Sequence, residues 1–95
     1  MIEIFSFKLL PGADEAAFLA ADKRLQAEFA YQQPGLMRRT TARATDGEWV
    51  VIDLWRSEAD ADRTSNVWGP DPVTAEFQSF VDPDTVLVRR FDELD

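Results

Sequence analysis

A β-hairpin between Leu36 and Arg56 is the sequence feature that most restricts how this chain can fold. Asp46-Gly47 separates two strand-like runs, LMRRTTARAT and EWVVIDLWR. An Asp-Gly pair suits a two-residue type I′ turn, in which both central residues need a positive φ. Counting outward from that turn places Arg38 opposite Trp55. The sequence therefore predicts two adjacent antiparallel strands with a defined register.

The second strand of this hairpin is apolar on both faces, because side chains alternate across a strand. One face carries Trp49, Val51, Asp53 and Trp55, and the other carries Val50, Ile52 and Leu54. A strand of this kind lies in a sheet that is covered on both faces. We expect the purely aliphatic face to meet the helices of the same chain. The other face, with Arg38 and Thr40, is then expected to face the interior of a barrel formed with a partner, although the reverse assignment stays open.

Composition narrows the classes of function. The 95 residues suit one domain, 1–95, and a hydrophobic content of 45% predicts a globular protein. The net charge of −8 and the lack of a basic face argue against nucleic-acid binding. The chain has no cysteine and no histidine, which excludes zinc-thiolate sites, iron–sulfur clusters, His-ligated haem and a His-bearing catalytic triad. We expect no metal site and no bound cofactor.

Hydropathy and the N-terminal sequence predict where the protein is located. No segment approaches the ~20 apolar residues of a membrane span. The chain starts directly in a strand pattern, without the features of a signal peptide. We therefore expect a cytoplasmic protein that does not bind a membrane.

The order of elements predicts the fold. The expected elements are a strand at Ile2–Leu9, a helix capped by Asp14 and ended by Pro34, the hairpin, a short helix from Ser57 to about Asn66, a second short helix capped by Asp71, and a strand at Thr85–Phe91. This is the order of the split β-α-β, ferredoxin-like arrangement. The fold class is α+β, with a four-stranded antiparallel sheet and its helices on one face.

Large apolar side chains on both faces of the strands imply a second covering layer. Helices of one chain cover only one face of such a sheet, and a large apolar patch on a monomer is unusual. We therefore expect a homodimer in which two copies pack sheet against sheet around a two-fold axis.

Short motifs that follow one another along nearly the whole chain carry a family resemblance. They are Phe7-Lys8-Leu9 with Pro11-Gly12, Gln33-Pro34-Gly35-Leu36, Gly47-Glu48-Trp49, Asp53-Leu54-Trp55-Arg56-Ser57, and Ala59 before a short helix. In this order they resemble the antibiotic-biosynthesis-monooxygenase-like family of dimeric α+β barrels. That family includes cofactor-free monooxygenases that oxidise polycyclic aromatic phenols, haem-degrading enzymes, and many members without an assigned function. The resemblance implies a cofactor-independent monooxygenase, or a related enzyme, acting on a small hydrophobic aromatic compound.

The haem-degrading branch of this family is a poor match. Its members use an asparagine on the first strand, a tryptophan on the helix after the third strand, and a histidine as the iron ligand. Here Phe5 occupies the first of these positions, the second falls near Thr64, and histidine is absent. All three roles fail, which argues against haem degradation.

Seven residues are candidates for substrate binding, and none is assigned a catalytic role: Asn66, Trp68, Phe5, Phe7, Arg38, Asp53 and Trp55. Arg38 and Asp53 share a face with Trp55. They form either an anchor for a carboxylate or phenolate or a plain cross-strand ion pair, and the ion pair is favoured because inward charges need partners.

The aromatic candidates also have two interpretations. Trp68 and Asn66 precede a Gly-Pro break, where they line a pocket mouth or plug a helix junction. Phe5 and Phe7 wall an aromatic cavity or belong to the plain core.

Two functions from different classes follow. The first is the monooxygenase-like enzyme. The second is a non-catalytic dimeric barrel that binds a small ligand or serves a stress-related role. A cavity beside Trp68, Asn66 and Phe5 with a polar side chain on its wall favours the enzyme, whereas a sealed and wholly apolar interior excludes it.

Overall fold

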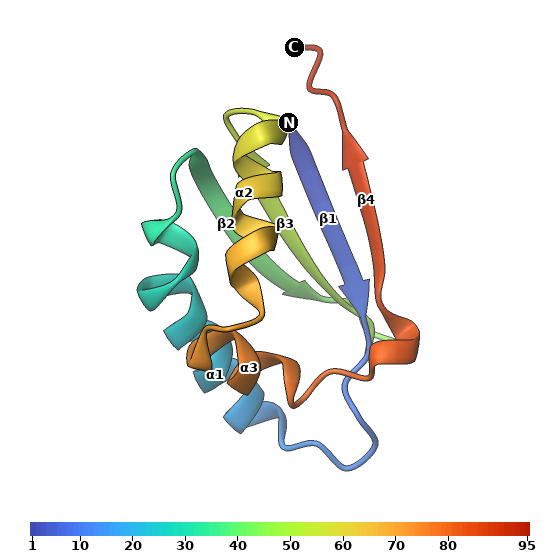
Figure 1. The fold of residues 1–95 in the computed structure, drawn as a ribbon. Helices are drawn as coiled ribbons and strands as arrows, with labels where there is room; N and C mark the ends of the chain where they lie inside the picture. Colours follow the sequence, from blue (N-terminus) through green and yellow to red (C-terminus); the bar gives the residue numbers. More distant parts are fainter.

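Four antiparallel strands form one sheet, and the α-helices pack on one face of it. The computed structural model describes all 95 residues. The strands are β1 (Ile2–Phe7), β2 (Leu36–Arg43), β3 (Trp49–Trp55) and β4 (Leu87–Phe91), in the spatial order β2-β3-β1-β4. The helices are α1 (Glu15–Glu28), α2 (Glu58–Trp68) and α3 (Pro72–Gln78), with short 3-10 helices η1 (Ala30–Gln32) and η2 (Pro83–Thr85). This arrangement (Figure 1) confirms the predicted ferredoxin-like α+β fold.

The predicted helix starts are observed. The side chains of Asp14, Ser57 and Asp71 each accept a hydrogen bond from a backbone N–H group in the first turn of their helices, at 3.2, 3.2 and 2.8 Å respectively. Such caps satisfy donors that have no partner within the helix. Local sequence is therefore sufficient to fix where α1, α2 and α3 begin.

The first and last strands in the sequence, β1 and β4, are shorter than predicted. Strand β1 ends at Phe7 because Leu9 leaves the sheet and forms an isolated bridge with Val81. Strand β4 begins at Leu87 because Thr85 belongs to η2, where its hydroxyl accepts a hydrogen bond from the backbone N–H of Lys8 at 2.9 Å. Both changes are local and leave the order of the elements unaltered.

The turn of the β2–β3 hairpin has three residues rather than the predicted two. Ala44 and Glu48 close it, because the N–H of Ala44 donates to the carbonyl of Glu48 at 2.7 Å. Only Gly47 in this turn has a positive φ, +90°, so Asp46 does not take the type I′ conformation. Its side chain instead accepts a hydrogen bond from the N–H of Glu48 at 3.0 Å.

The extra turn residue shifts the pairing of β2 against β3 by one position. Arg39 lies opposite Asp53, and Arg38 lies opposite Leu54 instead of Trp55. Neighbouring residues on a strand point to opposite faces, so Arg39 is only 6% exposed whereas Arg38 is exposed. The predicted placement of Arg38 beside Asp53 and Trp55 is therefore wrong, and Arg39 takes that place.

The two faces of β3 are the reverse of the expected assignment. Trp49, Val51, Asp53 and Trp55 are buried beneath the helices, whereas Val50, Ile52 and Leu54 lie on the open face of the sheet. The ring of Phe18 on α1 packs edge-on against Trp49, with the ring centroids 4.9 Å apart. Aromatic side chains bury more apolar area than aliphatic ones, which favours covering this face with helices of the same chain.

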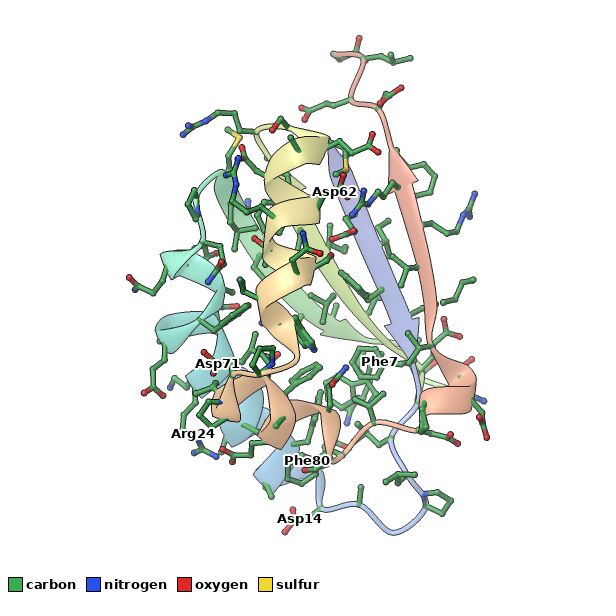
Figure 2. The ribbon with its side chains drawn as sticks, in the orientation of Figure 1. Phe7, Asp14, Arg24, Asp62, Asp71 and Phe80 are labelled. Atoms are coloured by element: carbon green, nitrogen blue, oxygen red, sulfur yellow. The ribbon has the colours of Figure 1, made fainter.

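A cluster of aromatic side chains lies where the sheet packs against α1 and α3. There the ring of Phe7 meets Phe18 and Phe77 edge-on, with centroids 6.0 and 5.9 Å apart. Phe80 joins the same cluster through Phe18, at 6.1 Å, and Figure 2 labels both Phe7 and Phe80 in this region. The aromatic cluster anchors the lower ends of β1 and β3 against the helices.

Two glycines with positive φ predict different responses to alanine. Gly35 has φ +87°, and a Cβ there would collide with the side chain of Asp60, whereas Gly47 has φ +90° and open space around it. We expect Gly47→Ala to lower the free energy of unfolding by roughly 1–2 kcal/mol, from backbone strain alone. Gly35→Ala should lose a further ~1–3 kcal/mol from steric overlap. Urea denaturation measures both, and equal losses would show that Asp60 moves aside freely.

Candidate functional site

Four charged side chains, one from each strand, form a row across the helix-covered face of the sheet. Arg39 of β2 pairs with Asp53 of β3, Asp53 with Glu3 of β1, and Glu3 with Arg90 of β4. We call these four residues the charged row. Arg39, Asp53 and Glu3 are only 6%, 8% and 4% exposed. Buried charges need partners, so the contacts of each member decide what the site can do.

Arg39 is held mainly by groups other than the charged row. Its guanidinium donates to Asp22 Oδ1 at 2.8 Å, to Gln26 Oε1 at 3.2 Å and to Thr41 Oγ1 at 3.3 Å. The hydroxyl of Tyr31 accepts a hydrogen bond from the backbone N–H of Arg39 at 2.9 Å. Asp22, which comes from α1, is therefore the hydrogen-bonded counter-ion of Arg39.

Arg90 links the edge strand β4 to both β1 and α2. Its Nε donates to Glu3 Oε2 and its Nη1 to Asp62 Oδ1, both at 2.7 Å, and Glu58 Oε1 lies 3.6 Å from Nη1. Figure 2 shows Asp62 on the side of α2 that faces β1 and β4. Hydrogen bonds to Asp62 and Glu3 raise the pKa of Arg90 above its usual value. Glu3 therefore already has a hydrogen-bonded cation, which it shares with Asp62.

Asp53 is the member of the charged row without a hydrogen-bonded cation. Its Oδ1 lies 4.0 Å from Nε of Arg39, which is beyond hydrogen-bond distance, and this oxygen has no other partner. Burial raises the pKa of Asp53 to about 7; the charge of Arg39 opposes this rise, and Glu3 and Asp22 add to it. The carboxyl can therefore exchange a proton near neutral pH, as a general base or acid must.

A cavity of about 340 Å³ lies between the sheet and helices α2 and α3, with Arg39, Asp53 and Glu3 on its wall. Most of the remaining wall is apolar and includes Phe5, Phe7, Val51, Trp68, Phe77 and Val88. The exposed lining residues Ser65, Gln78, Val86 and Val88 place its mouth between β4 and helices α2 and α3. Its volume and its mixture of apolar wall and few polar groups are typical of sites for small organic molecules.

Three buried polar atoms of the cavity-lining residues have no hydrogen-bond partner. They are Asp53 Oδ1, Trp55 Nε1 and Thr64 Oγ1. Buried polar groups are nearly always hydrogen-bonded in folded proteins, so these three atoms are unusual, and all three belong to residues that line one cavity. Thr64 lies four residues before Trp68 on α2, which puts both on the same side of that helix.

Five of the seven predicted site residues line this cavity: Phe5, Phe7, Asp53, Trp55 and Trp68. Arg38 and Asn66 are exposed and do not line it. Trp68 also packs edge-on against Phe29 and Phe77, with centroids 5.6 and 6.1 Å apart. It therefore both lines the pocket and closes the junction between α2 and α3.

The sequence interpretation missed Arg39, Glu3 and Thr64. Glu3 alternates with Phe5 and Phe7 on one face of β1, so an acidic residue within an apolar face was the available signal. Arg39 was missed because the predicted register placed it on the opposite face. Thr64 gave no signal of its own, because its role depends on where α2 lies over the sheet.

Other parts of the chain offer weaker sites. A hollow of about 550 Å³ beside the hairpin turn is lined by Lys8, Glu15 and Arg43 among others. Its ion pair between Arg43 and Glu15 is solvent-exposed, and none of the unpartnered buried atoms lies there. No group of three or more acidic side chains is arranged to hold a metal ion. None of the helices combines the length and apolar character that a membrane span requires.

Comparisons with known proteins identify solved structures that have a similar fold. No protein-family model and no curated protein sequence matches the chain. Among solved structures, the chain is similar to SnoaB, a cofactor-independent oxygenase from Streptomyces nogalater, with 22% identity, a TM-score of 0.79, and coverage of 99% of this chain and 92% of that one.

Two further structures give the same result. Rv0793 from Mycobacterium tuberculosis has 19% identity, a TM-score of 0.71, and coverage of 99% and 94%. A candidate antibiotic biosynthesis monooxygenase from Caulobacter crescentus has 17% identity, a TM-score of 0.76, and coverage of 99% and 89%. The predicted resemblance is thus confirmed at the level of structure: the chain has the fold of SnoaB and of the antibiotic-biosynthesis-monooxygenase-like proteins.

Proposed function

We propose that this protein is an enzyme that oxygenates a small hydrophobic aromatic compound without a cofactor. The observation that carries the proposal is a largely apolar cavity with a carboxyl group of pKa about 7 on its wall. The similarity to SnoaB, a cofactor-independent oxygenase, supports the class of reaction. Because a shared fold does not imply a shared function, the chemistry is argued from Asp53 and its surroundings.

In the proposed reaction the ionised Asp53 removes a proton from an acidic CH2 group of the ring substrate. The resulting carbanion passes one electron to O2, and the two radicals combine to form a carbon–oxygen bond. Asp53 returns its proton to the peroxide, which then loses water. One CH2 group and one O2 give one C=O group and one water molecule, and the substrate supplies all four electrons.

The cavity supports such an anionic intermediate in two ways. Its apolar wall, including Phe5 and Val51, keeps water away from the reacting carbon. Trp55 Nε1 and Thr64 Oγ1 have no partner within the protein, so each can donate a hydrogen bond to negative charge that develops on the substrate oxygen.

Anthrone is a suitable probe, because it is a tricyclic ketone with an acidic CH2 group. The proposal predicts that the protein accelerates oxygen uptake by anthrone, with one anthraquinone formed per O2 consumed. An oxygen electrode and absorption spectroscopy measure the two quantities. Saturable binding of anthrone without faster oxidation would contradict the proposal and support a non-catalytic ligand-binding protein instead.

We also propose that two copies of the chain associate through the open face of the sheet. That face carries the apolar residues Ile4, Val50, Ile52, Leu54 and Leu87. Ile52 is 38% exposed and Leu87 57% exposed. A contiguous apolar face of this kind marks an interaction site, and a self-complementary face suits a two-fold dimer.

Light scattering at micromolar concentration is expected to give twice the chain mass of 10.8 kDa. Ile52→Lys should give a monomer with unchanged circular dichroism, because it puts a charge into the centre of the apolar face. Leu19→Lys is the matched control: Leu19 is similarly exposed, at 43%, but lies on α1. A wild-type monomer would contradict the proposed dimer.

A further inference from the structure

The inner face of the sheet and α1 bring together more carboxylates than cations. Asp22, Asp53 and Glu3 surround the site together with Arg39 and Arg90. Arg39 is hydrogen-bonded to Asp22, and Arg90 is hydrogen-bonded to Glu3. Asp53 is the carboxylate without a hydrogen-bonded arginine, and its Oδ1 has no hydrogen-bond partner. When Asp53 is ionised, the site therefore carries at least one uncompensated negative charge.

This excess of negative charge is the opposite of what an anchor for a carboxylate requires. The only arginine on the cavity wall is Arg39, and Asp22 already occupies its guanidinium at 2.8 Å. A carboxylate ligand would meet Asp53 and Glu3 with no free cation to offset the repulsion. Like charges placed together in a poorly hydrated site are strongly unfavourable.

The three buried atoms without hydrogen-bond partners, Asp53 Oδ1, Trp55 Nε1 and Thr64 Oγ1, indicate which hydrogen-bonding groups a ligand needs. An ionised Asp53 Oδ1 can only accept hydrogen bonds, and Trp55 Nε1–H can only donate one. Thr64 Oγ1 can do either. The complementary ligand therefore has one donor and one acceptor on an aromatic frame that fills the apolar part of the cavity.

We propose that the cavity selects its ligand by charge. It binds aromatic molecules that carry no negative charge and that present a donor to Asp53 and an acceptor to Trp55, and it excludes the corresponding carboxylates. The proposal rests on the proposed function only in taking this cavity as the substrate site, and it concerns binding rather than turnover.

A matched pair of ligands tests the charge selection. 2-Naphthamide and 2-naphthoate have nearly the same shape, but only the amide has a donor and no charge. At pH 8, where Asp53 is ionised, isothermal titration calorimetry should show the amide binding roughly 10- to 100-fold more tightly. At pH 5.5 the preference should shrink, because a protonated Asp53 can donate a hydrogen bond to the carboxylate.

Two variants separate this effect from a general effect of protein charge. Asp53→Asn keeps the size of the side chain and removes the charge, so the amide preference at pH 8 should fall close to that of the wild type at pH 5.5. Asp84→Asn removes an exposed carboxylate on η2, outside the cavity, and should leave the preference unchanged. Circular dichroism checks that both variants are folded.

Three results would overturn the proposal: naphthoate binding as tightly as the amide to the wild type at pH 8, an amide preference that persists in Asp53→Asn, or binding of neither ligand. Its failure is distinguishable from failure of the proposed function. Oxidation of anthrone without a charge preference defeats the charge selection alone, whereas a charge preference without oxidation of anthrone defeats the oxygenase function alone.

Discussion

Asp53→Asn is expected to lose most of the oxygenase activity, with kcat on anthrone reduced by about 10²- to 10⁴-fold. Asparagine nearly matches aspartate in size, so the shape of the cavity is kept, but its amide cannot accept the substrate proton. In the wild type, kcat/KM should rise about tenfold per pH unit below pH 7 and level off above it, following ionisation of the group whose pKa is about 7. The residual activity of the variant should lack this dependence. Initial rates of oxygen uptake between pH 5 and 9 measure both effects.

The same substitution should stabilise the folded protein at alkaline pH. Burial raises the pKa of Asp53 from 3.8 to about 7, so the folded state binds this proton more tightly than the unfolded state does. The contribution of Asp53 to the free energy of unfolding is therefore fully present below pH 3.8. It is lost as the pH rises through 7, and the total loss is about 4 kcal/mol. Asparagine does not titrate and has no such loss. The free energy of unfolding of Asp53→Asn minus that of the wild type should increase between pH 4 and 8.

Urea denaturation at several pH values measures this difference. A variant that is inactive and more stable shows that the carboxyl is kept for function at the expense of stability. An active variant, or a difference in stability that does not change with pH, would contradict the role assigned to Asp53. Asp84→Asn serves as the control, because its exposed carboxyl should affect neither measurement.

Strand alternation is the part of the site that could be predicted from sequence. It correctly groups Asp53 with Val51 and Trp55, and Glu3 with Phe5, because a period of two does not depend on distant contacts. The pairing register between β2 and β3 could not be predicted in this way. Asp46-Gly47 is compatible with a two-residue turn and with a three-residue turn that ends in a glycine of positive φ, so the turn sequence alone does not choose.

Contacts between distant segments settle the register and the faces. With the three-residue turn, Arg39 reaches Asp22 on α1, 17 residues away in sequence, and Tyr31 binds its backbone. The two-residue turn would place Arg38 there instead and send Arg39 to the open face. The cavity is likewise non-local, because it exists only where α2 crosses the sheet and brings Thr64 and Trp68 over Asp53. No pattern within either segment contains that information.

Arg39→Met provides the sharpest test of this register. The substitution keeps most of the side-chain volume but leaves Asp22, which is 7% exposed, without its hydrogen-bonded cation. Breaking a buried ion pair by removing one partner lowers the free energy of unfolding by roughly 3–5 kcal/mol. Arg38→Met is the matched control, because Arg38 is exposed and has no ion pair; it should change stability by less than about 0.5 kcal/mol. Urea denaturation of both variants at pH 7 measures the difference. A larger loss of stability in Arg38→Met than in Arg39→Met would support the register of the two-residue turn instead.

Asp22→Asn should behave differently from Arg39→Met, although both break the same pair. With Asp22 neutral, Arg39 has a second carboxylate available, because Asp53 Oδ1 lies 4.0 Å from its Nε. The loss of stability should therefore be smaller than in Arg39→Met. The pKa of Asp53 should fall, since Asp22 is one of the charges that raise it and Arg39 opposes the rise. The pH at which kcat/KM on anthrone levels off should then move to lower values, and an unchanged profile would show that Arg39 does not control the proton affinity of Asp53.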